Sequence, residues 1–130
     1  MAKSIFKVGI VTVSDRAFKG IYEDQSGPAV KDWLESAIKS TYEIEIRVVP
    51  DEQEQIEAVF VDLADSEKCH LIVSSGGTGP AKRDVTPEAT LAIADKVMDG
   101  FGERMRAISL KYVPTAILSR QVGVLRGESL

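Results

Sequence analysis

The chain has 130 residues, which fits a single domain that buries roughly two-thirds of its unfolded surface. Its hydrophobic residues (44%) and charged residues (28%) exclude a disordered or collagen-like chain, and its net charge of −4 disfavours nucleic acid or an anionic membrane as the main partner. One cysteine and one histidine exclude an internal disulfide and the common zinc sites, and they fit a reducing, cytoplasmic compartment.

The first strand is expected close to the start of the chain. Residues 6–14 are β-branched and nearly continuously apolar, a pattern typical of a parallel strand covered by helices on both faces. Because this strand begins by Phe6, and because no segment approaches the ~20 apolar residues that cross a bilayer, we expect neither a signal peptide nor a membrane anchor.

An amphipathic helix and a second strand are expected next. After the polar residues 15–27, apolar residues recur at helical spacing, with Pro28 opening the helix and Trp33 in its core-facing stripe. Residues 42–49 alternate between apolar and charged side chains, which indicates a strand nearer a sheet edge.

A second helix and a third strand continue the alternation. Asp51 occupies a helix N-cap position before an apolar helical stripe that begins at Ile56. Residues 71–73 form a third short, buried strand, so the order is β-α-β-α-β. Cys69 and His70 lie at the start of this strand, away from the expected site, and we interpret both as structural.

The rest of the chain is predicted to hold two helices and one strand. Thr86 caps a helix that has a proline and an acid in its first turn and runs to about Ala94. Residues 101–112 follow a helical spacing, and residues 122–125 are expected to form one more strand.

The expected topology predicts where a ligand would bind. Parallel strands joined by helices place their ligands beyond the carboxyl ends of the strands. The loops at that edge begin at residues 14–16, 50–52 and 74–84, and each carries an acid. A functional site is therefore expected where these three loops meet.

The richest of these loops is SSGGTGPAKRDVTPEAT, residues 74–90. Three glycines within four positions allow positive φ and let backbone N–H groups approach an anion such as a phosphate. The loop lacks the Gly-Lys-Ser/Thr ending of a Walker A motif, and Lys82 stands in the third glycine's place of G-x-G-x-x-G, which disfavours both classes of enzyme. A tight turn that needs glycine only for its geometry is the alternative.

Charged residues around this loop fit nucleotidyl transfer. Lys82 and Arg83 could offset phosphate charge, while Asp84 and Asp51 could hold Mg²⁺ directly or through water. Simpler roles are open for each acid: Asp51 as a helix cap, Asp84 in a turn or paired with Arg83, and Asp15 in a surface ion pair with the following arginine.

Five sequence blocks occur in order along nearly the whole chain. They are GIVTVSDRA from Gly9, PDE at 50–52, SSGGTGPAKRDVTPEAT from Ser74, GFGERMR from Gly100 and VPTAILSRQVGV from Val113. Together they resemble the molybdopterin adenylyltransferase family of the MogA type. A lone GGTG would be weak support, whereas five blocks in register are specific.

The resemblance implies a fold and an activity. The fold is a three-layer α/β/α sandwich with a mostly parallel, Rossmann-like sheet, commonly assembled as a homotrimer. Members bind molybdopterin and, using ATP and Mg²⁺, attach AMP to its terminal phosphate and release pyrophosphate. The product goes to the next enzyme of molybdenum cofactor biosynthesis, which inserts the metal.

The resemblance also bears on domain organisation. Family members continue past the strand that matches residues 122–125 with a further strand, a proline-containing loop and a final helix. Residues 1–130 are therefore expected to form a single molybdopterin-binding domain without that segment.

The site residues follow from the matching positions. Asp51 and Asp84 match the functional acids of the family, and we assign both to catalysis and to Mg²⁺ binding. Because both reacting groups are negative phosphates, positioning and charge neutralisation must supply most of the rate. The residues expected to bind substrate and nucleotide are Ser14, Asp15, Arg16, Ser75, Gly76, Gly77, Thr78, Gly79, Lys82 and Arg83.

Two rival classes of function are open at this point. One is a non-catalytic molybdopterin-binding or scaffold module, since relatives fused into larger proteins also serve in protein interaction. The other is a flavodoxin-like nucleotide or flavin protein, which the order of strands and helices alone would allow. An aromatic content of 6% leaves few rings to stack on a flavin and counts against the latter.

Overall fold

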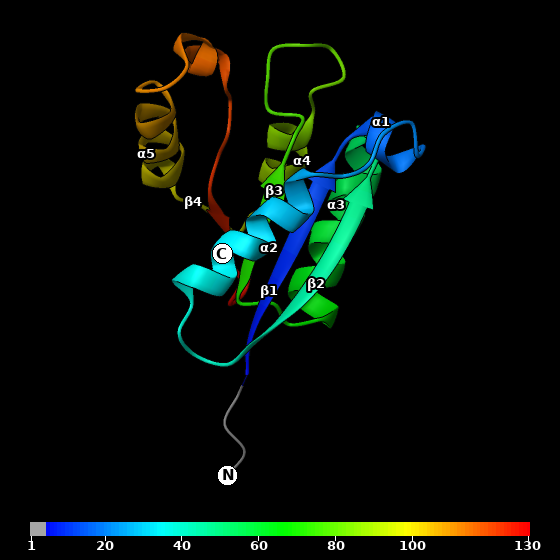
Figure 1. The fold of residues 1–130 in the computed structure, drawn as a ribbon, viewed down its shortest axis with the longest axis vertical. Coiled ribbons are helices and arrows are strands. Elements are labelled where there is room, and N and C mark those ends of the chain that lie inside the picture. Colours follow the sequence, from blue (N-terminus) through cyan, green and yellow to red (C-terminus); the bar gives the residue numbers. More distant parts are fainter. Residues whose placement is uncertain (1–4) are drawn as a thin grey trace.

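A parallel three-stranded sheet forms the centre of the computed structural model, which describes residues 5–130 (Figure 1). Its strands are β1 (Phe6–Val13), β2 (Tyr42–Val49) and β3 (Leu71–Ser75), in the order β2-β1-β3. The central strand β1 pairs in parallel with both neighbours over their full lengths. The predicted parallel sheet is confirmed.

Helices cover both faces of this sheet, so the predicted α/β/α layering is confirmed. On one face α2 (Ser26–Ala37) packs Leu34 against the β1 side chains Val8 and Ile10. On the other face α3 (Gln53–Val61) and α4 (Thr86–Ala92) bury Ile56, Phe60 and Ala89 against the β1 side chains Val11 and Val13. Successive side chains of a strand point to opposite faces, which is why one apolar strand serves two cores.

Two predictions about α2 need correction. The helix begins at Ser26, not at Pro28, because the Asp24 carboxylate accepts hydrogen bonds from the N–H groups of Ser26 and Gly27 at 3.1 and 3.2 Å. Trp33 was expected in the core but is 65% exposed, whereas the next residue, Leu34, is 2% exposed. The helix lies on a single sheet face, so only one row of its two adjacent apolar rows is buried.

A short helix and a π-helical turn complete the first half of the fold. The segment expected to be a polar loop contains α1 (Asp15–Phe18), and the turn η1 (Asp62–Ser66) extends α3. Ser14 precedes α1, and its Oγ accepts a hydrogen bond from the N–H of Ala17 at 3.2 Å.

The final third of the chain lies beside β3, to which its last residue is hydrogen-bonded, and it carries a second, two-stranded sheet. It contains β4 (Lys96–Val97), α5 (Asp99–Ser109), the 3-10 turn η2 (Pro114–Leu118) and β5 (Val124–Leu125). The strand expected at 122–125 is thus shorter, and it pairs antiparallel with β4 and not with the main sheet. Within residues 5–130, none of the helices combines the length and apolarity needed to cross a membrane.

The start of α4 differs from its prediction by one residue. Thr86 is the first residue of the helix, and Val85 precedes it in the cap position. The Thr86 hydroxyl does not cap the helix but donates to the carbonyl oxygen of Gly76 at 2.9 Å, which ties the helix to the loop that follows β3.

Candidate functional site

The three loops predicted to meet do meet at the carboxyl edge of the sheet. In Figure 1, α1 and the loop between β3 and α4 lie at the same end of the molecule as the tip of β2. Asp15 follows β1, Asp51 follows β2, and Asp84 closes the loop after β3. Each strand therefore contributes one aspartate to this edge.

Asp15 and Asp51 hold each other by reciprocal hydrogen bonds. The N–H of Asp15 donates to Asp51 Oδ2 at 3.0 Å, and the N–H of Asp51 donates to Asp15 Oδ1 at 3.0 Å. Asp51 is consequently not the N-cap of α3. That position belongs to Glu52, which makes no side-chain capping bond, so the capping role predicted for Asp51 is wrong.

The charges of these acids are balanced unequally. Arg83 binds Asp15 through two bonds, Nε to Oδ2 at 2.7 Å and Nη2 to Oδ1 at 3.0 Å, and it also reaches Glu52 at 2.9 Å. These bonds lower the pKa of Asp15 and raise that of Arg83. The pKa of Asp51 is raised, first by burial and then by the negative charges of Asp15 and Asp84. Asp51 is thus the acid at this edge whose charge is poorly compensated.

The structure also decides between the simpler roles considered for Asp15 and Asp84. Asp15 pairs with Arg83 and not with Arg16, which instead lies over the ring of Tyr22 at 5.2 Å from its centroid. Asp84 stabilises a turn, accepting a hydrogen bond from the N–H of Ala81 at 3.1 Å.

The glycines after β3 are required by close contacts as well as by dihedral angles. Gly76 and Gly77 have φ values of 96° and 69°, and a Cβ on Gly76 would lie 2.1 Å from the carbonyl oxygen of Val13. A Cβ on Gly77 would lie 2.3 Å from Thr86 Oγ1 and 3.1 Å from Asp51 Oδ1. The glycine geometry expected of a tight turn is confirmed, and it brings the loop backbone against Asp51.

The same loop exposes backbone N–H groups that are free to donate hydrogen bonds. Within residues 5–130, the backbone N–H groups of Gly77, Thr78 and Gly79 donate to no carbonyl or side chain. Consecutive free N–H groups on a backbone with positive φ form the kind of concave surface that binds anions. Lys82 lies exposed further along the loop, and Ser75 ends β3 opposite Thr12.

Arg120 also contacts this loop, and sequence reasoning did not single it out. It lies between η2 and β5, and its N–H donates to the carbonyl oxygen of Thr78 at 2.7 Å. Its guanidinium binds the carbonyl oxygens of Gly79 and Asp84 at 2.9 and 2.7 Å and the Glu88 carboxylate at 2.5 Å. The only sequence signal was its place in the block VPTAILSRQVGV, because periodicity cannot report a contact between loops.

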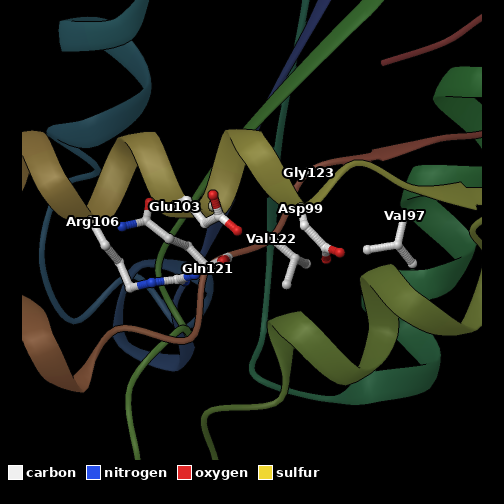
Figure 2. Close-up of a pocket in the computed structure, with 8 residues that line it drawn as sticks. Val97, Asp99, Glu103, Arg106, Gln121, Val122 and Gly123 are labelled. Atoms are coloured by element: carbon white, nitrogen blue, oxygen red, sulfur yellow. Dashed lines mark hydrogen bonds between the residues drawn. The ribbon is translucent and has the colours of Figure 1, made fainter.

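Within residues 5–130, two cavities were found that are lined by none of the three aspartates. The larger, about 620 Å³, extends from Gly76 and Thr78 along β3 and α4 to the C-terminal residues. The smaller, about 120 Å³, lies against α5 between Glu103, Arg106 and the segment 121–123, where Arg106 Nη1 donates to the carbonyl oxygen of Gln121 at 2.7 Å (Figure 2). The carboxylates of the candidate site stand at an open edge of the sheet.

Metal ligands at this edge are few. Among the residues that the structure describes, no group of three or more His, Cys, Asp and Glu side chains is arranged to hold a metal ion. Asp51 and Asp84 therefore provide two carboxylates, and any cation bound there would need further ligands from a substrate or from water.

The chain is similar to known proteins over most of its length. A family described as "Probable molybdopterin binding domain" matches residues 9–129. The molybdopterin adenylyltransferase of Haemophilus influenzae is 58% identical to this chain over 127 residues, which is 98% of the chain. That of Escherichia coli K12 is 56% identical over 124 residues, or 95% of the chain. The chain spans 64% of the length of each of these two relatives.

Solved structures agree on the fold. The molybdopterin biosynthesis enzyme MoaB of Thermus thermophilus superimposes with a TM-score of 0.85 at 40% sequence identity. The superposition covers 96% of this chain and 77% of that one.

Proposed function

This chain belongs to the family of probable molybdopterin-binding domains, and from that premise we propose that it transfers AMP from ATP to the terminal phosphate of molybdopterin. An oxygen of the molybdopterin phosphate attacks the α-phosphorus of ATP, the bond from that phosphorus to the bridging oxygen breaks, and pyrophosphate leaves. The names of relatives at 56–58% identity support this activity. The observation that carries it is the placement of Asp51, an undercompensated carboxylate, against a loop of free N–H donors.

The chain's own groups match what such a reaction needs. Both reactants are anions, so the repulsion between them must be offset by hydrogen-bond donors and cations that are in place before the reaction. We assign this task to the N–H groups of Gly77, Thr78 and Gly79, with Ser75, Gly76, Lys82 and Arg83 around them. Ser14, Asp15 and Arg16 line the neighbouring wall. Neither Asp51 nor Asp84 need act as a general base, because the attacking phosphate oxygen is already ionised at neutral pH.

The donor set also fits a magnesium ion. Burial and the charges of Asp15 and Asp84 raise the pKa of Asp51, so a cation beside this carboxylate would relieve an existing repulsion. We propose that Asp51 and Asp84 hold Mg²⁺ directly or through water, with phosphate oxygens as further ligands. When bound, the ion would neutralise phosphate charge at the reacting groups.

The family resemblance supports three broader proposals. Residues 1–130 act as one molybdopterin-binding domain, the protein works as a homotrimer in the cytoplasm, and its product passes to the enzyme that inserts molybdate.

The test is single-turnover formation of adenylylated molybdopterin and pyrophosphate. Asp51→Ala and Asp84→Ala should each lower the rate by more than about tenfold while the thermal transition is retained. Asp32→Ala, at an exposed position of α2, is the matched control and should keep the wild-type rate.

Two results would contradict the proposal. Wild-type rates in both variants would remove the site assignment. Molybdopterin binding without product in the wild-type chain would favour the scaffold module.

A further inference from the structure

Arg120 joins two parts of the molecule that lie far apart in sequence. Its backbone binds the carbonyl oxygen of Thr78, and its guanidinium binds those of Gly79 and Asp84. These carbonyls stand at the two ends of the segment 79–84, which carries the exposed Lys82 and ends in the aspartate of the candidate site. A single residue therefore fixes both ends of this segment.

The direction of these bonds matters for the donors of the loop. In a planar trans peptide the C=O and the following N–H point in opposite directions. With its carbonyl turned to Arg120, Thr78 leaves the N–H of Gly79 pointing away from Arg120, and this N–H has no acceptor within residues 5–130. The backbone N–H of Arg120, by holding the Thr78 carbonyl, thus sets the direction of the Gly79 N–H, and the guanidinium holds the residues that follow through the carbonyls of Gly79 and Asp84.

Few other contacts hold the segment. Ala81 and Asp84 bond to each other within it, and Arg83 ties it to Asp15 and Glu52 on the other side. Ordering a flexible backbone costs conformational entropy, so a loop that is anchored before the substrate arrives does not have to be ordered during the reaction.

We propose that Arg120 is a positioning residue. By holding the carbonyls of Gly79 and Asp84, its guanidinium keeps the segment 79–84 in the conformation in which the Gly79 N–H and the Asp84 carboxylate face the substrate phosphates. This proposal rests on the function proposed for the loop edge.

A simpler role would be a charge pair with Glu88. The guanidinium binds both Glu88 oxygens, at 2.5 and 3.1 Å, and the two side chains are 41% and 42% exposed. Exposed ion pairs usually contribute little, but bidentate arginine–carboxylate pairs are an exception, so the role of Glu88 has to be tested by its own variant. A lysine would keep such a pair but cannot span two carbonyls and a carboxylate with one fixed fork of donors. The conservative variant therefore separates positioning from charge.

The kinetic test compares Arg120→Met, Arg120→Lys and Glu88→Gln, with Arg104→Met on the exposed face of α5 as the matched control. For Arg120→Met we expect the single-turnover rate to fall more than about tenfold while the ATP dissociation constant changes less than about threefold. Arg120→Lys should stay closer to the methionine variant than to wild type, whereas Glu88→Gln and the control should stay within about threefold of wild type. A wild-type rate in Arg120→Lys would overturn the proposal.

A second readout does not depend on adenylyl transfer. Trypsin cleaves after Lys82 and Arg83, and Lys111 in the turn after α5 provides an internal reference. Loss of the Arg120 guanidinium should raise the rate of cleavage after Lys82 and Arg83, relative to the rate after Lys111, by at least about fivefold. If the wild-type chain makes no product, the proposed function fails, while the loop-anchoring claim is still decided by this cleavage.

Either variant can decide the question. Unchanged cleavage in a folded Arg120→Met would overturn the proposal. Should that variant not fold, Arg120→Lys carries the test, with faster loop cleavage expected and unchanged cleavage overturning it.

Discussion

At the amino edge of the three-stranded sheet a carboxylate is paired with a lysine, whereas at the carboxyl edge the carboxylate of Asp51 forms no ion pair within residues 5–130 and has a raised pKa. At the first edge Lys7 Nζ binds Glu67 Oε2 at 2.6 Å, and His70 Nδ1 accepts the N–H of Lys7 at 3.1 Å. The predicted structural role of His70 agrees with this contact. The Glu67 hydrogen bond raises the pKa of Lys7, which means that each charge stabilises the other.

At the carboxyl edge Arg83 pairs with Asp15 and Glu52, and within residues 5–130 it forms no ion pair with Asp51 or Asp84. Arg83 compensates Asp15, and Asp51 is left with a raised pKa, which means that its ionised form is disfavoured. The strands are the same at both edges, so the difference lies in the loops. An arrangement that opposes stability and is nevertheless built by specific hydrogen bonds is typical of a functional site.

The largest effect is expected from the backbone of the carboxyl edge. Gly76→Ala places a Cβ 2.1 Å from the carbonyl oxygen of Val13 at a φ of 96°, and we expect a loss of more than about 2 kcal/mol in the free energy of unfolding. Gly127→Ala, at a φ of 55° in open space, should cost only about 1 kcal/mol. Urea unfolding measures both. Equal losses would mean that the close contact with β1 does not matter.

A smaller effect, opposite in sign at the two edges, is expected from removing one charge. Asp51→Asn keeps an oxygen that accepts the N–H of Asp15 and removes a disfavoured charge. The free energy of unfolding should therefore rise by about 0.5–1 kcal/mol, while the turnover should fall. Glu67→Gln breaks the ion pair with Lys7 and should lower the thermal midpoint. If both substitutions lower the midpoint, the carboxyl edge is not electrostatically strained.

The smallest expected effect is a change with pH in the stability that Asp51→Asn gains over wild type. The pKa of Asp51 lies above its ordinary value of 3.8, so the folded state binds the proton more tightly than the unfolded state, and acidification through that raised pKa favours folding. The gain from Asp51→Asn should therefore be largest at neutral pH and narrow on acidification toward the ordinary pKa, where the wild-type carboxyl becomes neutral. Thermal scans of wild type and Asp51→Asn at several pH values in metal-free buffer measure this change. A difference in thermal midpoint that does not vary with pH would show that ionised Asp51 does not destabilise the fold.

The sequence predicted what local patterns determine. The run of apolar residues in β1 and the alternation in β2 located these strands to within one residue, and the topology then placed three loops at one edge. That the acids follow these strands could be predicted, because the carboxyl ends of parallel strands share an edge. The catalytic and binding roles of the residues at this edge stay predictions until the variants are measured.

The sequence could not predict contacts between loops. The reciprocal bonds of Asp15 and Asp51 replaced a helix cap that the local pattern favoured, and Arg120 reaches the glycine-rich loop from a remote segment. The exposure of Trp33 was missed for a related reason: an apolar stripe shows which helix positions can be buried, but the width of the packed face decides which of them are.

The position of Trp33 has a practical consequence for spectroscopy. It is the only tryptophan in the chain, and its indole already lies mostly in water in the folded state. Unfolding should therefore shift its emission little, so fluorescence would underreport the transitions compared above and circular dichroism is the better probe. The same exposure makes the indole a reporter for anything that covers the outer face of α2, because a bound surface would move its emission toward shorter wavelength.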